Sequence, residues 1–235
     1  MSTDYYTRLE QGRGPHPSAQ LLTSLGRALR FDADQNDHLF HLAGLTPPVR
    51  RSYGHIRPGL IKLADHLVDV PVCIMSDLGE VLWQNAMADI TLWPRVTRPG
   101  RERNVTWLWF TSPALRARFP QEDWPHHVAA HVSDLRATAA RRAGDADVES
   151  LVADLLAAST EFAELWERHD VAVRRFDQKR LVHPEVGIIH VTCEMLLTPT
   201  ADVQLLAFFP TEGTDAREKL DLLRVIGTQD LSTTR

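Results

Sequence analysis

The sequence predicts an α+β protein, in which a small all-helical module precedes a larger module with an antiparallel sheet of about five strands and several helices. Three observations lead to this prediction. Residues 1–45 carry apolar residues at helical spacing, and a stretch rich in Pro, Arg and Gly follows at residues 46–57. In residues 58–235, two short strands come first, amphipathic helices follow, and strands with alternating apolar residues come last. Strands and helices segregated along the chain in this way are typical of an α+β fold.

Composition excludes several classes of protein. The chain has 235 residues, of which 43% are hydrophobic and 24% charged, as is typical of a globular protein. No apolar run reaches the roughly 18 residues of a membrane span, and the N-terminus lacks the features of a secretory signal. Two cysteines, Cys73 and Cys193, are too few for a disulfide framework and lie in apolar stretches. We therefore expect buried thiols and a cytoplasmic location.

The net charge of −5 argues weakly against a chain devoted to nucleic-acid binding, but the charge is not uniform. Residues 1–53 contain six arginines and five acidic residues, whereas residues 54–235 contain 20 basic and 26 acidic residues. The charges therefore permit a basic first module without indicating one.

Capping residues divide the first module into three short helices. Ser2 can cap the first helix, and a glycine ends it. Ser18 can cap the second, whose apolar residues follow the helical period. Asp32 and Gln35 can form a capping box for the third. Helices this short bury little apolar surface, so we expect the module to be only marginally stable by itself.

The larger module contains strands at both of its ends and helices in its middle. The expected strands are residues 70–76, 81–84, 171–176, 179–183, 187–197 and 203–210. The expected helices are residues 58–66, 85–92, 104–110, 125–143, 147–158 and 159–169, with a last helix capped by Asp215. Residues 93–103 are expected to form a basic loop. An antiparallel sheet with helices packed on one face is the plan of a PAS-like sensor domain.

Three segments of the first module, STDYYTRLEQGR, PSAQLLTSLGRALRFD and HLFHLAG, resemble the second half of a bacterial helix-turn-helix domain of the repressor type. The resemblance implies that residues 2–11 form the recognition helix, which reads bases in the major groove. It places Thr3, Asp4 and Arg8 at base edges, and Ser2 and Arg13 near phosphates. The sequence contains no counterpart of the first two helices of that domain, so we expect DNA binding by these 235 residues to be impaired.

Longer blocks of the larger module carry a more specific resemblance. These blocks are PVCIMSDLGEVLWQNAMAD, NVTWLWFTSPALRARF, LVADLLAASTEFAELWERHDV and HPEVGIIHVTCEMLLTPTADVQLLAFFPTEG. Together with the N-terminal segments they are similar to the MmyB-like transcription regulators, in which a helix-turn-helix domain precedes a PAS-like ligand-binding domain. The resemblance implies a one-component regulator, in which a small apolar ligand such as a fatty acid biases a DNA-binding homodimer.

A sensor of this kind needs an apolar cavity with a few polar groups. Large apolar side chains could form its wall, namely Trp83, Trp107, Phe110, Leu155, Phe162 and Trp166. Each of them could instead be an ordinary core residue. Asn85 directly follows a strand and could anchor the head group of the ligand, or it could simply cap the following helix.

His169 and Arg175 are further candidates for ligand binding. His169 lies on the same apolar stripe as Trp166, and Arg174 and Arg175 follow shortly after it. A His and Arg pair suits a carboxylate, because charge-assisted hydrogen bonds offset the loss of hydration. The alternative for His169 is a helix C-terminus, where the helix dipole favours histidine. We interpret His183 as a turn residue.

Catalysis and metal binding are not indicated by the sequence. His127 and His131 are spaced for one helix face, but no Glu follows His127 as in zinc proteases, so we expect a solvated helix face. We find no glycine-rich phosphate loop, nucleophile elbow or metal-binding cysteine spacing. The sequence therefore predicts neither an enzyme nor a cofactor. Two functions remain: a ligand-responsive transcription regulator, or a stand-alone PAS-like binding protein that has lost DNA binding and acts through protein partners.

These 235 residues should bind DNA weakly, with strong salt dependence and little sequence specificity, whereas a version extended upstream should bind a specific site as a dimer. Arg8→Ala in the extended version should relax this specificity, since an arginine at a guanine edge contributes roughly 1–3 kcal/mol of discrimination. Mobility-shift titrations at two salt concentrations measure both effects. Nanomolar binding of an operator by the 235 residues at physiological salt would contradict this expectation.

Overall fold

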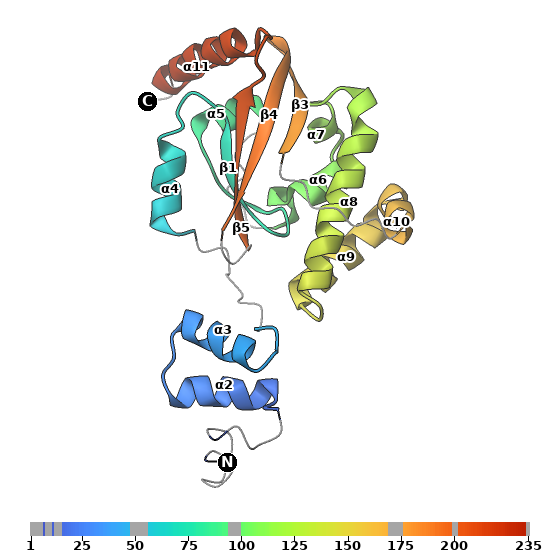
Figure 1. Cartoon of the computed structure of the whole chain (residues 1–235). Helices are drawn as coiled ribbons and strands as arrows, with labels where there is room; N and C mark the ends of the chain where they lie inside the picture. Colours follow the sequence, from blue (N-terminus) through green and yellow to red (C-terminus); the bar gives the residue numbers. More distant parts are fainter. Residues whose placement is uncertain are drawn as a thin grey trace. The chain divides into compact units, whose positions relative to one another are not determined.

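The computed structural model describes residues 7, 11, 16–47, 56–93, 100–168, 176–198 and 202–233. The chain forms two compact units, residues 1–50 and residues 51–235, which are described separately below (Figure 1). The side chains expected to contact DNA lie outside the described residues, namely Ser2, Thr3, Asp4, Arg8 and Arg13.

Within residues 16–47 the first unit contains two helices in contact, α2 (Ala19–Ala28) and α3 (Ala33–Leu42). Ser18 caps α2, and Asp32 and Gln35 form the capping box of α3, as the sequence predicts. The helices approach closely at Gly26, where a Cβ atom would lie 1.8 Å from Oδ1 of Asn36. A larger residue at position 26 would therefore displace the Asn36 side chain, whose amide donates to the carbonyls of Phe31 (3.3 Å) and Asp32 (3.0 Å).

The second unit is built around a five-stranded antiparallel sheet with the strand order β2-β1-β5-β4-β3 (Figure 1). The strands are β1 (Val72–Ser76), β2 (Val81–Gln84), β3 (Phe176–His183), β4 (Gly187–Leu197) and β5 (Val203–Pro210). Because β1 pairs with β5 in the middle of the sheet, the two ends of the unit are joined by backbone hydrogen bonds. The α+β class predicted from the sequence is confirmed.

The expectation that helices pack on one face of the sheet is wrong, because helices cover both faces. Helix α4 (Pro58–Asp65) packs against Val72 and Ile74 on one face, while Cys73 and Met75 face the larger core on the other. The larger core includes side chains from these helices: α5 (Ala86–Thr91), α6 (Val105–Thr111), α7 (Pro113–Arg116), α8 (Trp124–Arg141), α9 (Ala146–Ala158), α10 (Thr160–Glu167) and α11 (Ala216–Thr233). Two short 3-10 helices precede α6 and α8, at Arg101–Arg103 and Gln121–Asp123. Among the described residues, no helix is long and apolar enough to span a membrane.

Strand β3 corrects the sequence analysis, which expected separate strands at residues 171–176 and 179–183. The structure has one continuous strand, Phe176–His183, paired with β4 along its whole length. Gln178, at the expected break, pairs with Thr192. Pairing with the long β4 satisfies the backbone of this polar stretch, so its low strand propensity does not interrupt the ladder. Residues 171–175 lie outside the described residues.

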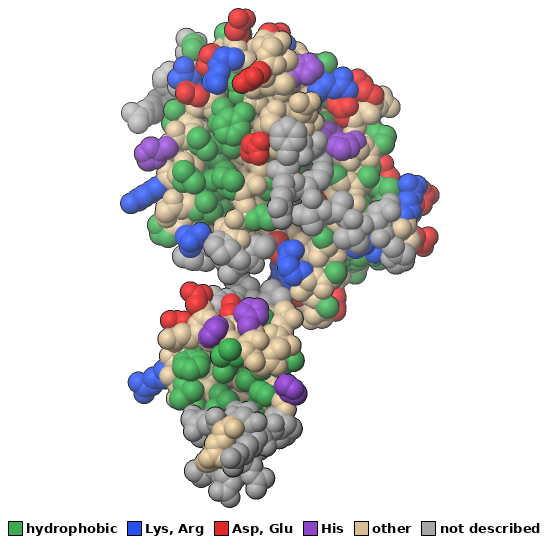
Figure 2. Space-filling view, viewed as in Figure 1, with side chains coloured by type: hydrophobic (Ala, Val, Ile, Leu, Met, Phe, Trp, Pro, Cys, Tyr) green, Lys and Arg blue, Asp and Glu red, His purple; other side chains and the backbone are tan. Residues whose placement is uncertain are grey.

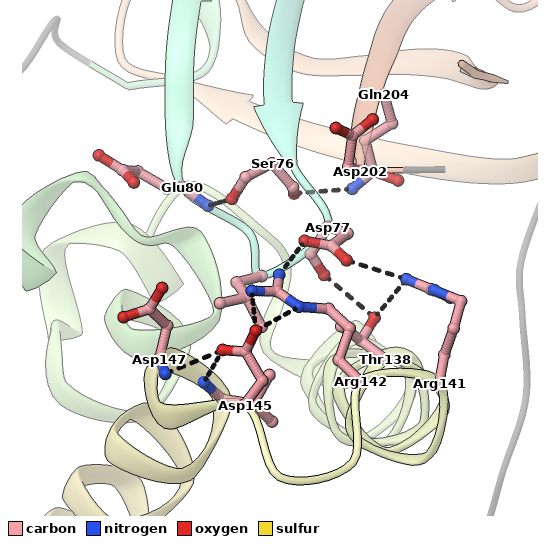
Figure 3. A network of polar contacts seen from close by, with 12 residues as sticks. Ser76, Asp77, Glu80, Thr138, Arg141, Arg142, Asp145, Asp147, Asp202 and Gln204 are labelled. Carbon is pink, nitrogen blue, oxygen red and sulfur yellow. Dashed lines mark hydrogen bonds and ion pairs between the residues drawn. The ribbon is translucent and has the colours of Figure 1, made fainter. Parts of the chain in front are cut away.

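A network of ion pairs joins the turn between β1 and β2 to the helices (Figure 3). Asp77 in this turn pairs with Arg142 (2.7 Å) and Arg141 (3.0 Å) at the end of α8. Arg142 also pairs with Asp145 (3.0 Å), which caps α9 by accepting hydrogen bonds from its first backbone N–H groups. The side chains of Asp77, Arg142 and Asp145 are largely buried, at 8%, 13% and 9% exposed. The network therefore connects three elements through one guanidinium.

The charges of this network stabilise one another against the cost of burial. Burial acts to raise the pKa of Asp145, but the hydrogen bonds and charge of Arg142 bring that pKa below its ordinary value. Burial acts to lower the pKa of Arg142, but the hydrogen bonds to Asp145 and the charges of Asp77 and Asp145 raise it overall. Asp145 and Arg142 are therefore an ion pair near neutral pH.

Asp145→Ala should lower the free energy of unfolding by about 2 kcal/mol at pH 7, because an N-cap alone contributes about 0.5–2 kcal/mol and the buried Arg142 also loses a partner. Urea denaturation of the full chain measures the change. The lowered pKa of Asp145 means that its contribution is present above the pKa of unfolded aspartate, about 3.9, and is lost as the pH falls through the folded value.

Asp154→Ala is the matched control, since Asp154 pairs with Arg101 at 2.6 Å but is 48% exposed. It should change the free energy of unfolding by less than about 1 kcal/mol. Equal effects of the two substitutions would show that the buried network does not contribute as inferred.

Residues 54–235 should unfold in a single cooperative thermal transition without the first unit, because the sheet and both of its apolar cores lie within this range. Calorimetry on the fragment tests this. A gradual, uncooperative loss of secondary structure would contradict the proposed domain boundary.

Candidate functional site

A cavity of about 100 Å³ lies between the sheet and helices α6 and α8. Its apolar lining consists of Met75, Leu78, Gly79, Trp93, Val105, Trp109, Phe119, Leu135, Cys193, Met195, Leu206 and Phe208. Its polar lining consists of Asp77, Thr106, His131, Asp134, Lys179 and Gln204. A mostly apolar lining with a few polar groups is the usual composition of a small-molecule site.

The size of the cavity sets the kind of group that it can hold. A cavity of about 150 Å³ lined by apolar side chains can bind benzene, so about 100 Å³ suits a compact apolar group. Sites for drug-sized ligands are larger, about 300–1,000 Å³. A longer molecule therefore requires lining side chains to move. Met75 and Met195 are suited to this, because methionine is unbranched and adapts readily to its surroundings.

Lys179 and His131 bring polar atoms to the cavity from opposite layers. Lys179 on β3 lies with Nζ 3.4 Å from Nδ1 of His127, and His131 on α8 lies with Nδ1 3.3 Å from Oγ1 of Thr106. The solvated helix face expected for the histidines is wrong. His127 is 1% exposed, and its ring packs against Trp109 with centroids 4.9 Å apart. The reason is the helical period, which places His127 and His131 beside the buried stripe of α8.

The turn between β1 and β2 forms one wall of the cavity. Gly79 has a φ of +85°, and a Cβ atom there would lie 2.8 Å from Oγ1 of Thr106, so the position requires glycine. Its carbonyl accepts from the N–H of Val105 at 2.8 Å, and Nδ2 of Asn104 donates to the carbonyl of Leu78 at 2.8 Å. Burial raises the pKa of the Asp77 carboxyl, and the charges and hydrogen bonds of Arg142 and Arg141 offset this effect only in part.

Both cysteines are free thiols in the core, as the sequence predicts. Cys193 is 4% exposed and lines the cavity. Cys73 is fully buried, and burial raises the pKa of its thiol, with a smaller contribution from the charge of Cys193. These thiols therefore belong to the apolar lining and core rather than to a reactive centre. Among the described residues, no group of three or more His, Cys, Asp or Glu could hold a metal ion.

The residues expected to form the ligand wall belong mainly to the core beside the cavity. Phe110 and Phe162 pack edge to face with centroids 5.1 Å apart, and Trp166 stacks on Phe162 at 5.4 Å. Leu155 is fully buried in the same core, and Trp107 packs against it. Trp83 instead packs on the opposite face of the sheet, with the core that includes α4. The structure thus brings five of these six residues together, next to the residues that line the cavity.

Asn85 has every hydrogen-bonding position of its side chain engaged by backbone groups. Its oxygen accepts from the N–H groups of Val72 (3.1 Å) and Ala88 (2.9 Å). Its amide donates to the carbonyls of Leu67 (3.0 Å) and Val70 (2.9 Å). Asn85 caps α5, and these contacts explain its place without a ligand; its role as a ligand anchor stays a prediction.

The other predicted polar residues have different outcomes. His169 and Arg175 lie outside the described residues, so their role in ligand binding also stays a prediction. His183 is 7% exposed, and its Nδ1 accepts from the N–H of Glu185 at 3.3 Å, as suits a turn residue. Burial lowers the pKa of His183, and the charge of Arg118 lowers it further.

Three residues that line the cavity were not predicted from the sequence as site residues: Thr106, Trp109 and Lys179. The spacing of Val105 and Trp109, four residues apart on one helix face, is a signal that could have identified Trp109. For Lys179 the sequence carries no such signal, because its place in the cavity depends on the register between β3 and β4.

Comparison with known proteins agrees with this geometry. No curated protein matches the chain. The family model of the MmyB-like transcription regulator ligand binding domain matches residues 56–223, a range that contains the sheet and every residue lining the cavity. The chain therefore belongs to the MmyB-like transcription regulator family, and residues 56–223 are its ligand-binding domain.

Proposed function

We propose that the chain is a ligand-responsive transcription regulator, in which the cavity of the second unit binds a small apolar ligand and the first unit contacts DNA as part of a homodimer. The observation that carries the proposal is the cavity itself, whose lining is apolar except for six polar residues. Membership of the family supplies the general role of a transcription regulator ligand-binding domain. Binding of DNA, the ligand class and the dimer are the proposed parts.

A fatty acid is the ligand class that we propose. The apolar lining suits a hydrocarbon chain, because each buried CH₂ group contributes about 0.8 kcal/mol. Lys179 supplies a partly buried ammonium at the cavity, where a carboxylate would form a charge-assisted hydrogen bond. Since the cavity measures about 100 Å³, a medium acyl chain fits only if methionine side chains move aside. His169 and Arg175 remain the alternative site for the head group.

A stand-alone binding protein that acts through protein partners is the second candidate function. It is favoured by one observation: every residue that lines the cavity lies between positions 75 and 208, within the second unit. Ligand binding therefore does not require the first unit. Specific, salt-dependent binding of promoter DNA supports the regulator, and its absence from an upstream-extended chain supports the binding protein.

Decanoate should bind the full chain, and Lys179→Met should weaken this binding at least about tenfold, since a hydrogen bond to a charged group contributes about 1.5–3 kcal/mol. Isothermal titration calorimetry measures the affinity. Decan-1-ol, which has the same chain length without the charge, should bind wild type and Lys179→Met equally.

Lys62→Met is the control, because Lys62 is exposed on α4 at the other face of the sheet. It should leave decanoate affinity unchanged. Equal losses for both variants would mean that decanoate binds the surface non-specifically. Failure of both decanoate and decan-1-ol to bind would contradict the acyl-ligand proposal.

A further inference from the structure

Trp93 lines the cavity, and the N–H of its indole is a buried hydrogen-bond donor. Trp93 follows α5 and is one of the lining residues. Its backbone is held on both sides, because its N–H donates to the carbonyl of Ala88 at 3.4 Å and its carbonyl accepts from Nε2 of Gln84 at 3.1 Å. Its Nε1 atom is buried and has no hydrogen-bond partner within the part of the chain that the structure describes.

An unpaired indole N–H in this position has an energetic cost. The group is a donor only, and buried tryptophans usually find an acceptor for it. Trp124 in the same domain does so, since its Nε1 donates to the carbonyls of Arg116 (3.0 Å) and Phe119 (3.1 Å). Leaving a buried donor without a partner costs roughly 1–3 kcal/mol. Because Trp93 also lines a cavity, we expect that its indole N–H receives an acceptor when a ligand binds there.

Two polar side chains of the lining already make contacts within the protein. The Asp77 carboxylate pairs with Arg141 and Arg142, which hold it toward the end of α8 (Figure 3). The Gln204 side chain donates to the carbonyl of Ser76 at 3.4 Å. The rest of the lining is mostly apolar, so a molecule that brings an oxygen to Trp93 would itself be mostly apolar.

We propose that Nε1 of Trp93 donates a hydrogen bond to an oxygen of the bound ligand. This inference rests on the proposed ligand-binding function of the cavity and narrows it. The ligand is an apolar molecule that carries an acceptor oxygen, such as a carbonyl, on the part that enters the cavity. Trp93 is therefore a specificity-determining residue, because its hydrogen bond raises the affinity for oxygenated ligands above that for hydrocarbons of the same shape.

Acetophenone and ethylbenzene are suitable probes, because they have similar shape and differ by a carbonyl oxygen. Both are larger than benzene, so each requires lining methionines to move to the same extent in a cavity of about 100 Å³. Trp93→Phe should lower acetophenone affinity about three- to tenfold in the full chain, as expected for the loss of one hydrogen bond, and leave ethylbenzene affinity nearly unchanged. Trp124→Phe is the control, since Trp124 does not line the cavity and its indole N–H already has acceptors within the protein, and it should change neither affinity.

A spectroscopic measurement on the wild-type chain keeps the test independent of the stability of the variant. Acetophenone should move the indole N–H signal of Trp93 downfield in a ¹⁵N-correlated NMR spectrum, and ethylbenzene should not produce this downfield shift. Equal losses for both probes in Trp93→Phe, or an indole signal that responds alike to both, would overturn the inference and indicate that water pairs with Nε1. Failure of both probes to bind wild type would instead count against the cavity as a ligand site, and against this inference with it.

Discussion

The ion pairs of Arg142 with Asp77 and Asp145 are the constraint on which the geometry of the cavity depends. The guanidinium is only 13% exposed, so it has lost most of its hydration, and two carboxylates take the place of water. One carboxylate lies in the turn between β1 and β2, and the other caps α9. Since Arg142 lies at the C-terminal end of α8, one side chain fixes three elements at a single point (Figure 3).

The same turn is held on its other side by the start of α6, through the hydrogen bonds of Asn104 and Val105. The turn therefore carries Leu78 and Gly79 into the cavity wall on a backbone that is fixed from two directions. Apolar packing alone closes gaps, because side chains relax into empty space. A wall fixed by directional contacts resists this relaxation, which gives a physical reason for a cavity at this place in the core. On the opposite face of the sheet, α4 packs with Val72 and Ile74 in a separate core. Figure 2 shows hydrophobic side chains gathered on the visible surface of the second unit.

Local signals were predictable from the sequence, whereas the site was not. Ser18, Asp32, Asn85 and Ser159 cap helices where their sequence patterns predict, because a cap depends on residues within one turn. The aromatic residues Phe110, Phe162 and Trp166 were predicted either to line the ligand cavity or to be ordinary core residues, and the structure packs them against one another. The cavity itself joins residues that are up to about 130 positions apart, such as Met75 and Phe208. Its lining depends on the register of the strands and on how α8 packs against the sheet. Neither of these is encoded in a local sequence pattern.

The cavity adjoins the predicted aromatic wall without coinciding with it, and the shapes of the side chains account for this. Phe110, Phe162 and Trp166 pack ring against ring, and Arg136 lies over the Trp166 ring at 4.1 Å, so flat groups fill that part of the core. The cavity instead has Met75 and Met195 on its sheet side. A ligand would then displace flexible methionines rather than a helix, at a modest cost. Because such a ligand binds only the folded domain, its affinity adds directly to the free energy of unfolding, and occupancy of the cavity and stability of the domain are thermodynamically linked.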